Sequence, residues 1–97
     1  MTKADIINEV SRNTGFTKIE VENQLDCIIN SIKISLSKGE RVDIRGFGSF
    51  CTKVRRSREA RNPATNETII LDKKYVPFFK VSKLLKEYVD IEMKERV

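Results

Sequence analysis

The feature that most constrains this chain is a long polar segment, residues 53–74, near the middle of its 97 residues. Strand-like residues enter and leave the segment, and the turn-forming sequence NPATNE separates its two limbs. At about 3.3 Å per residue, each limb of about ten residues would reach roughly 30 Å. The segment has no evident partner in a core, so the sequence predicts a two-stranded β-ribbon arm, which is marginal in water on its own.

Most of the net charge of the chain lies on the same segment. Residues 53–74 hold seven basic and three acidic residues, a net charge of +4, whereas the whole chain carries +5. A concentrated positive segment is typical of a surface that binds a polyanion such as a nucleic acid. The alternative is a solvated run of charges, which is common on protein surfaces.

Two helices are predicted in the first part of the chain. Thr2 is a suitable N-cap for a helix over 3–14, and Gly15 is a suitable residue just after its end. A T-x-x-E capping box at Thr17 begins a second helix, which Gly39 ends. The apolar stripe of this second helix consists of Val21, Leu25, Ile28, Ile29, Ile32 and Leu36. Two helices joined by so short a turn are expected to pack as a hairpin.

After the helices the apolar period changes from 3.6 to two. In RVDIRGFGSF, Val42 and Ile44 alternate with polar residues, and 46–48 are predicted to form a tight turn. A second strand leads into the arm, and TIILDKKYVPFFKV returns as a third. Ser82 can N-cap a final helix, whose charged tail 91–97 is expected to fray. The order α-α-β-β-β-α predicts one α+β domain that spans residues 1–97.

Composition argues against several other classes of protein. The chain has two cysteines, Cys27 and Cys51, and no histidine, too few ligands for a zinc site. We expect both thiols to be reduced, and no metal or other cofactor. The N-terminus lacks the apolar core of a signal peptide, and no stretch approaches the length of a membrane span, so a soluble intracellular protein is expected. No phosphate-cradling glycine loop or catalytic histidine suggests an enzyme.

Three short segments carry a resemblance to a known family. The sequences RGFGSF at 45–50, ARNPATNETI at 60–69 and YVPFFK at 75–80 resemble signature segments of the bacterial histone-like HU and integration host factor family. The opening MTKADIINEV is also similar, and the resemblance covers residues 1–90. It implies a nucleoid-associated cytoplasmic protein that bends and condenses duplex DNA. It also implies an intertwined dimer with a helical base, a three-stranded antiparallel sheet in each subunit, and β-ribbon arms in the minor groove.

The resemblance also implies which residues meet DNA. Pro63 would be an apolar wedge between base pairs, with Arg61 placing a cation in the groove and Asn62 bonding to the acceptors of A·T pairs. The other implied DNA-binding positions are Lys3, Arg41, Arg45, Gly46, Lys53, Arg55, Arg56, Arg58, Lys73, Lys74, Lys80 and Lys83.

A further set of residues is expected in the core of the dimer. This set consists of Ile32, Leu36, Ile44, Phe47, Phe50 and Phe79. The chain departs from the family where Phe-Lys-Pro-Gly-Lys is usual, because it has Val81 and Ser82 in place of Pro-Gly. YVPFFK is more similar to the integration host factor branch than to HU. A homodimer and a heterodimer with a related chain both stay open, as do nonspecific and site-specific binding.

Two other kinds of function compete with DNA bending. The ribbon could add to the sheet of a protein partner or bind RNA, and the helical pair could be a helix-turn-helix. The second of these is disfavoured because neither helix has a polar, arginine-rich face suited to the major groove. A non-enzymatic architectural DNA-binding protein, with no membrane or small-molecule partner, is therefore the leading hypothesis.

Overall fold

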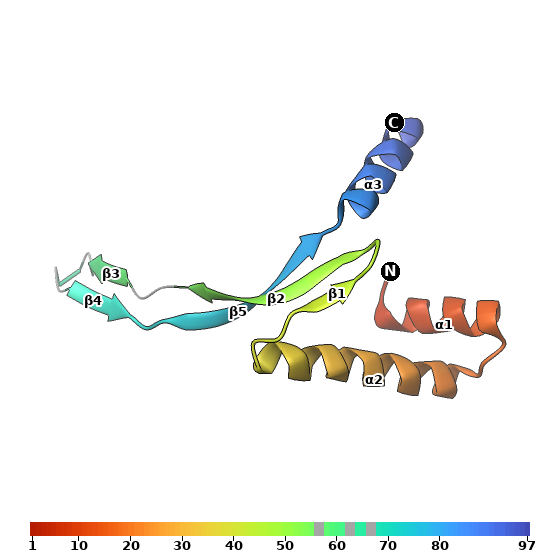
Figure 1. The fold of residues 1–97 in the computed structure, drawn as a ribbon, viewed down its shortest axis with the longest axis horizontal. Coiled ribbons are helices and arrows are strands. Elements are labelled where there is room, and N and C mark those ends of the chain that lie inside the picture. The colour runs from red at the N-terminus through yellow and green to blue at the C-terminus, as the bar shows by residue number, and fades with distance from the viewer. Residues whose placement is uncertain (56–57, 62–63, 66–67) are drawn as a thin grey trace. The chain divides into compact units, whose positions relative to one another are not determined.

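The computed structural model of the chain describes residues 1–55, 58–61, 64–65 and 68–97, with side chains outside 58–61 and 68–71 (Figure 1). The chain divides into two compact units, Met1–Ile34 and Ser35–Val97. Three helices and an antiparallel three-stranded sheet make up the α+β fold that the sequence predicted.

The first helix has the predicted bounds and caps. Helix α1 spans Lys3–Thr14. The Thr2 hydroxyl accepts a hydrogen bond from the Asp5 N–H at 3.4 Å, and the Asp5 carboxylate accepts one from the Thr2 N–H at 2.8 Å. Gly15 has a φ of 82°, and its N–H donates to the Ser11 carbonyl. The capping box and the left-handed glycine therefore set the two ends of this helix.

Helix α2 spans Lys18–Ser37, and its residues 18–34, which belong to the first unit, run antiparallel to α1 (Figure 1). It starts where the Thr17 hydroxyl accepts from the Glu20 N–H at 3.2 Å. Ile7 and Val21 are 8% and 4% exposed and are the only buried apolar side chains among those that the structure describes. This core is small, because a chain of this size buries only a modest fraction of its surface.

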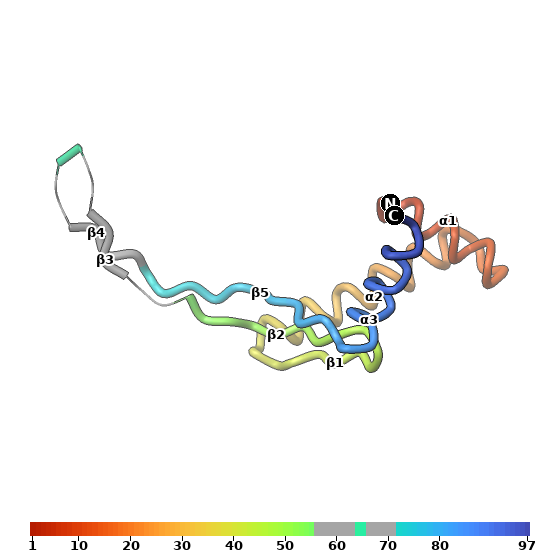
Figure 2. The backbone as a smooth tube through the Cα atoms, turned by 90° about the horizontal axis from the view of Figure 1, so that it is seen from above, coloured from red at the N-terminus to blue at the C-terminus, as the bar shows by residue number. Residues whose placement is uncertain are grey.

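The second unit contains a sheet in the order β1-β2-β5, formed by Val42–Ile44, Gly48–Arg55 and Lys74–Val81. Strand β5 pairs with the whole of β2, whereas β1 pairs only with its first three residues. Beyond β1 the sheet is therefore a ribbon of two strands, which lie side by side in Figure 2.

The tight turn between β1 and β2 lies one to two residues earlier than predicted. It spans 44–47, with the Phe47 N–H donating to the Ile44 carbonyl at 3.0 Å and Gly46 at a φ of 81°. Gly48, assigned to the turn from sequence, is instead the first residue of β2 and pairs with Ile44. The reason is that only one position in such a turn needs positive φ, and Gly46 supplies it.

The arm contains a second ladder, between β3, Arg58–Arg61, and β4, Thr68–Leu71. Its register continues that of β2 and β5, because Arg55 pairs with Lys74 and Arg58 with Leu71, three residues further on each strand. The sequence predicted one uninterrupted third strand, but the described strand is interrupted at 72–73. The aspartate and lysine at these positions are depleted in strands, which accounts for the break.

Helix α3 spans Lys83–Arg96, and the Ser82 hydroxyl accepts from the Leu85 N–H at 3.1 Å as its N-cap. The helix extends into the tail 91–97 as far as Arg96, and the fraying expected there stays a prediction. An ion pair between Lys94 and Asp90 at 3.1 Å supports this last turn, together with basic residues near the helix C-terminus. In the described part of the chain, no helix is long and apolar enough to cross a membrane.

Candidate nucleic-acid interface

The sheet of the second unit has two chemically different faces. Successive side chains of a strand point to opposite faces, so the register assigns each residue to one of them. The apolar face carries Val42, Ile44, Phe50, Val54, Tyr75, Phe79 and Val81. The basic face carries Asp43, Ser49, Cys51, Lys53, Arg55, Lys74, Val76, Phe78 and Lys80.

Contacts within the second unit agree with this assignment. The Phe50 and Phe79 rings lie 4.8 Å apart between centroids on the apolar face. The Thr52 hydroxyl, on that same face, donates to the Leu36 carbonyl at the end of α2 at 2.8 Å. The end of a helix therefore lies on the apolar side, and the cations lie on the other.

An open hollow of about 460 Å³ beside the β1–β2 turn, the turn hollow, brings several predicted positions together. Its lining includes the predicted DNA-binding residues Arg41, Arg45, Gly46, Lys80 and Lys83. Arg41 lies just before β1, Arg45 and Gly46 lie in the turn, and Lys80 and Lys83 lie near the end of β5 and at the start of α3. A hydrogen bond of 2.9 Å, from the N–H of the α3 N-cap to the carbonyl of the turn, holds these elements together.

The N-terminus of α3 also opens into the turn hollow, since both Ser82 and Lys83 line it. The unpaired N–H groups of a helix N-terminus favour an anion, as the nearby cations do. Ser82 caps α3 although the related family usually has Pro-Gly at positions 81 and 82. The turn hollow is suited to a phosphate group.

The sequence reasoning did not assign a role to Asp43, which lies among these cations. The Arg41 Nε donates to the Asp43 carboxylate at 2.7 Å, and the Ser49 hydroxyl donates to the same oxygen. The hydrogen bond from Ser49, followed by that from Arg41, lowers the pKa of Asp43, and Asp43 in turn raises the pKa of Arg41. Asp43 therefore places a negative charge against the Arg41 guanidinium.

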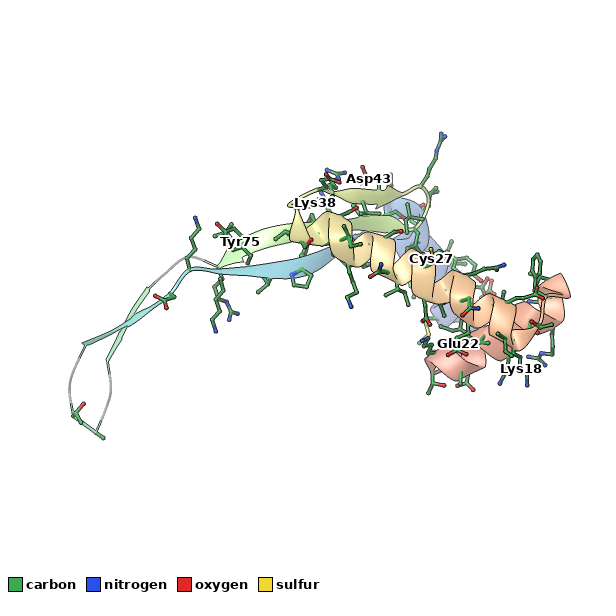
Figure 3. All side chains as sticks on the ribbon, turned by 90° about the horizontal axis from the view of Figure 1, so that it is seen from below. Lys18, Glu22, Cys27, Lys38, Asp43 and Tyr75 are labelled. Carbon is green, nitrogen blue, oxygen red and sulfur yellow. The ribbon has the colours of Figure 1, made fainter. Side chains whose placement is uncertain are left out.

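Asp43 is labelled on β1 in Figure 3. Its spacing from Arg41 by two residues was a usable signal in the sequence, because residues two apart share one face of a strand. The contribution of Ser49 was not accessible in the same way. It depends on the register that pairs Asp43 with Ser49 across two strands.

The predicted cations further along the sheet are exposed. Lys53, Arg55 and Lys74 lie on the basic face of β2 and β5. The Lys53 ammonium lies 3.4 Å from the centroid of the Phe78 ring. Lys73 lies just before β5, with its ammonium 5.5 Å from the ring centroid of Tyr75, which Figure 3 labels.

Lys3, also a predicted DNA contact, belongs to the first unit. Its ammonium forms an ion pair with Asp26 at 2.6 Å, and both side chains are about half exposed. The hydrogen bond to Asp26 raises the pKa of Lys3, with a smaller opposing contribution from desolvation. Lys3 is thus exposed and charged, but it has a carboxylate partner within its own unit.

The predicted tip of the arm lies outside the described side chains. The positions concerned are Arg56, Arg58, Arg61, Asn62 and Pro63. Strand assignments exist for Arg58 and Arg61, and they agree with a ribbon. The roles of all five stay predictions.

The residues expected in a dimer core are largely uncovered in the single chain. Phe47, Ile44 and Phe79 are 45%, 40% and 37% exposed. Ile32, Leu36 and Phe50 are half-buried. The Phe79 ring contacts both neighbouring phenylalanines, with centroid distances of 5.2 and 4.8 Å. This aromatic cluster thus exposes an apolar surface that a single chain leaves in water.

Within the described residues there is no group of three or more histidine, cysteine, aspartate or glutamate side chains that could hold a metal ion. Both cysteines are free thiols.

Comparisons with known proteins agree on one family. The profile of the family described as "Bacterial DNA-binding protein" matches residues 1–90. Integration host factor subunit beta of Actinobacillus pleuropneumoniae serotype 3 (strain JL03) is 48% identical over 92 residues, which cover 94% of this chain and 99% of the relative. The protein of that name from Histophilus somni (strain 2336) is 46% identical, with coverage of 94% and 98%.

Solved structures give the same result for the fold. The Anabaena HU–DNA cocrystal structure has a TM-score of 0.82 and 35% identity, covering 92% of this chain and 97% of that one. HU from Thermotoga maritima has a TM-score of 0.65 and 34% identity, covering 92% and 98%.

Proposed function

Because this chain belongs to the bacterial DNA-binding protein family of HU and integration host factor, we propose that it bends and compacts duplex DNA as a dimer. Membership makes it a non-enzymatic architectural DNA-binding protein, and the proposal concerns how it holds DNA. The observation that carries the proposal is the separation of the sheet into a basic and an apolar face. One face suits the phosphate backbone, and the other suits a second subunit.

The basic face and the turn hollow would supply the affinity. Their lysines and arginines match the charge of the phosphate backbone, and each phosphate contact releases counterions from the duplex. Such contacts position a protein on DNA but carry no sequence information by themselves. The sheet is therefore proposed to make the contacts with the duplex that do not depend on DNA sequence.

The arm would supply the bend. Minor-groove architectural proteins insert apolar side chains between base steps and kink the duplex. Pro63 is proposed as this wedge, with Arg61 and Asn62 in the groove beside it. A strong bend costs on the order of 1–6 kcal/mol, which the additional protein–DNA contacts of a wrapped duplex offset.

A second subunit would cover the apolar face. Two buried apolar side chains in the described residues are a small core for a folded chain, while Phe47 and Phe79 remain partly in water. Burial of this surface would add stability at roughly 25 cal/mol per Å² of apolar area. Two relatives of this chain are named as subunit beta of integration host factor. Both a second copy of this chain and a related chain are therefore candidate partners.

The test is a titration of a fluorescent duplex at several salt concentrations, with energy transfer between dyes at the two DNA ends. We expect log K to fall linearly with log salt, by about 0.9 for each phosphate contact, and the ends to approach on binding. A slope of log K against log salt near zero would contradict binding through phosphate contacts. Binding without approach of the two DNA ends would contradict bending. In cells, the proposal predicts localisation to the nucleoid.

A further inference from the structure

The basic face contains one large aromatic side chain, Phe78, which is 39% exposed among lysines and arginines. The register pairs Phe78 with Cys51 and Val76 with Lys53, so Lys53 is a diagonal neighbour of Phe78 on the same face. The Lys53 ammonium lies 3.4 Å from the centroid of the Phe78 ring. This is well within the roughly 6 Å over which a cation is attracted to the face of an aromatic ring.

The cations of Lys53, on β2, and of Arg41, just before β1, have different kinds of partner. Asp43 binds the Arg41 guanidinium and offsets its charge. Across the described residues, no carboxylate forms an ion pair with Lys53, and the partner of its ammonium is a neutral ring. A ring restricts the position of the ammonium and leaves its net charge intact.

We propose that Phe78 is a positioning residue for DNA binding, which holds the Lys53 ammonium on the basic face in readiness for a phosphate group. This inference rests on the proposed function and adds a specific residue to it. A lysine ammonium has three N–H donors. The ring occupies one side of the ammonium, and the donors on the other side stay available to a phosphate oxygen.

The gain in DNA affinity from the Phe78 ring arises from conformational entropy. A lysine side chain loses much rotamer freedom when it is fixed at an interface, and that loss weakens binding. Phe78 restricts the lysine before DNA arrives, so less freedom is lost on binding. Leucine fills a similar space but lacks the negative face of an aromatic ring, so it would not hold the ammonium in this way.

The experiment is a double-mutant cycle on the affinity for a fluorescent duplex at fixed salt. We expect Phe78→Leu to weaken binding about 2- to 5-fold, equivalent to about 0.5–1 kcal/mol at 1.4 kcal/mol per tenfold change. In a Lys53→Gln background the same substitution is expected to change affinity by less than about 1.5-fold, because the ammonium is already absent. Phe78→Tyr keeps an aromatic face and should bind within about 1.5-fold of the wild type.

A matched control uses Lys74, which lies on the basic face of the same strand but is not held by this ring. Phe78→Leu in a Lys74→Gln background should retain its full 2- to 5-fold effect, since the two sites are independent. Thermal unfolding of each variant checks that the fold is kept. If Phe78→Leu does not fold, the ring-current shift of the Lys53 ε-methylene protons in wild-type NMR spectra replaces it, and this shift should persist in the DNA complex.

Each of the other outcomes would overturn the inference. Unchanged or tighter binding by Phe78→Leu would mean that the ring is irrelevant or competes with phosphate. An equal loss in the Lys53→Gln background would mean that Phe78 acts directly or through the fold. Absence of the ring-current shift in the DNA complex would also contradict it. Failure of the wild-type protein to bind the duplex would instead contradict the proposed function itself.

Discussion

Gly48 lies directly against the ring of Phe79, so that a Cβ atom at Gly48 would come within 2.5 Å of the Phe79 Cζ. Gly48 is buried and pairs with Val81 at the end of β5. This glycine is therefore required by its neighbours and not by its backbone angles. The absence of a side chain at Gly48 allows the Phe79 ring to approach the start of β2, where it meets the rings of Phe47 and Phe50.

We predict that Gly48→Ala destabilises the protein by roughly 1–3 kcal/mol, the usual range for overpacking a site that has no free space. Denaturant unfolding at fixed protein concentration measures the change. Lys86→Ala, at an exposed position of α3, is the matched control and should stay within about 0.5 kcal/mol of the wild type. An equal effect of the two substitutions would mean that the Phe79 ring and the Lys80 carbonyl oxygen, which the Cβ atom would approach to 2.6 Å, both move aside without loss.

Asp43 is predicted to lower the affinity for DNA, because its negative charge lies against the Arg41 guanidinium. Asp43→Asn keeps the size of the side chain and removes its negative charge. We expect tighter binding to a duplex without a specific site, and a salt slope that is steeper by up to about one unit. The measurement is the salt-dependent titration, with Asp90→Asn on α3 as a control for the loss of a distant carboxylate. Weaker binding by Asp43→Asn would mean that Asp43 orients a cation that DNA needs.

The N-terminal capping box should contribute both stability and a pH dependence. The backbone N–H and the hydroxyl of Thr2 lower the pKa of Asp5. A carboxyl with a depressed folded-state pKa stabilises the fold above its ordinary pKa of about 3.8, and this contribution is lost as pH falls toward the folded-state value. Asp5→Asn should therefore reduce stability at pH 7 and flatten its decline in acid, as measured by denaturant unfolding at pH 7 and pH 3.

The hydroxyl of Thr2 makes a separate prediction within the same box. Thr2→Ala should lower the free energy of unfolding by about 1 kcal/mol, the usual cost of losing an N-cap. Thr2→Ser keeps the acceptor oxygen and should lose little of this. Equal loss in the two variants would show that the threonine methyl group, and not the hydrogen bond, is what matters.

The parts of the fold that were predictable from sequence depend on signals within a few residues of each other. Thr2, Gly15 and Ser82 mark helix ends through contacts spanning at most four residues, and the structure confirms all three. The cation-rich segment was likewise visible in the order of the residues alone.

The details that sequence did not predict depend on which residues lie opposite each other across strands. Ser49 meets Asp43, and Phe78 supports Lys53, only because of the observed register. A shift of one residue would move each side chain to the other face. The predicted position of the β1–β2 turn was wrong for a related reason. Gly46 and Gly48 are close together in the sequence, and both were plausible turn residues. Gly48 is needed for the approach of Phe79, which no local pattern reveals.

The exposed apolar face predicts that stability depends on protein concentration. If a second subunit covers Phe47 and Phe79, the unfolding temperature should rise with total protein concentration, as mass action requires of a dimer. Phe47→Asp should place a charge in that interface and shift the mass measured by light scattering toward the monomer. A wild-type protein that is monomeric and equally stable at all concentrations would contradict this prediction.

The proline at the predicted tip of the arm should affect DNA shape more than affinity. If Pro63 enters between base pairs, Pro63→Ala removes most of the wedge and leaves the cations of the basic face unchanged. We expect the bend measured by energy transfer between the DNA ends to decrease clearly, with affinity reduced by less than about tenfold. Lys53→Gln should show the reverse pattern, weaker binding with a lower salt slope and a nearly unchanged bend at saturation. If every substitution in the ribbon reduced affinity and bend in proportion, Pro63 would have no separate role as a wedge. That outcome would favour the alternative of a protein- or RNA-binding ribbon.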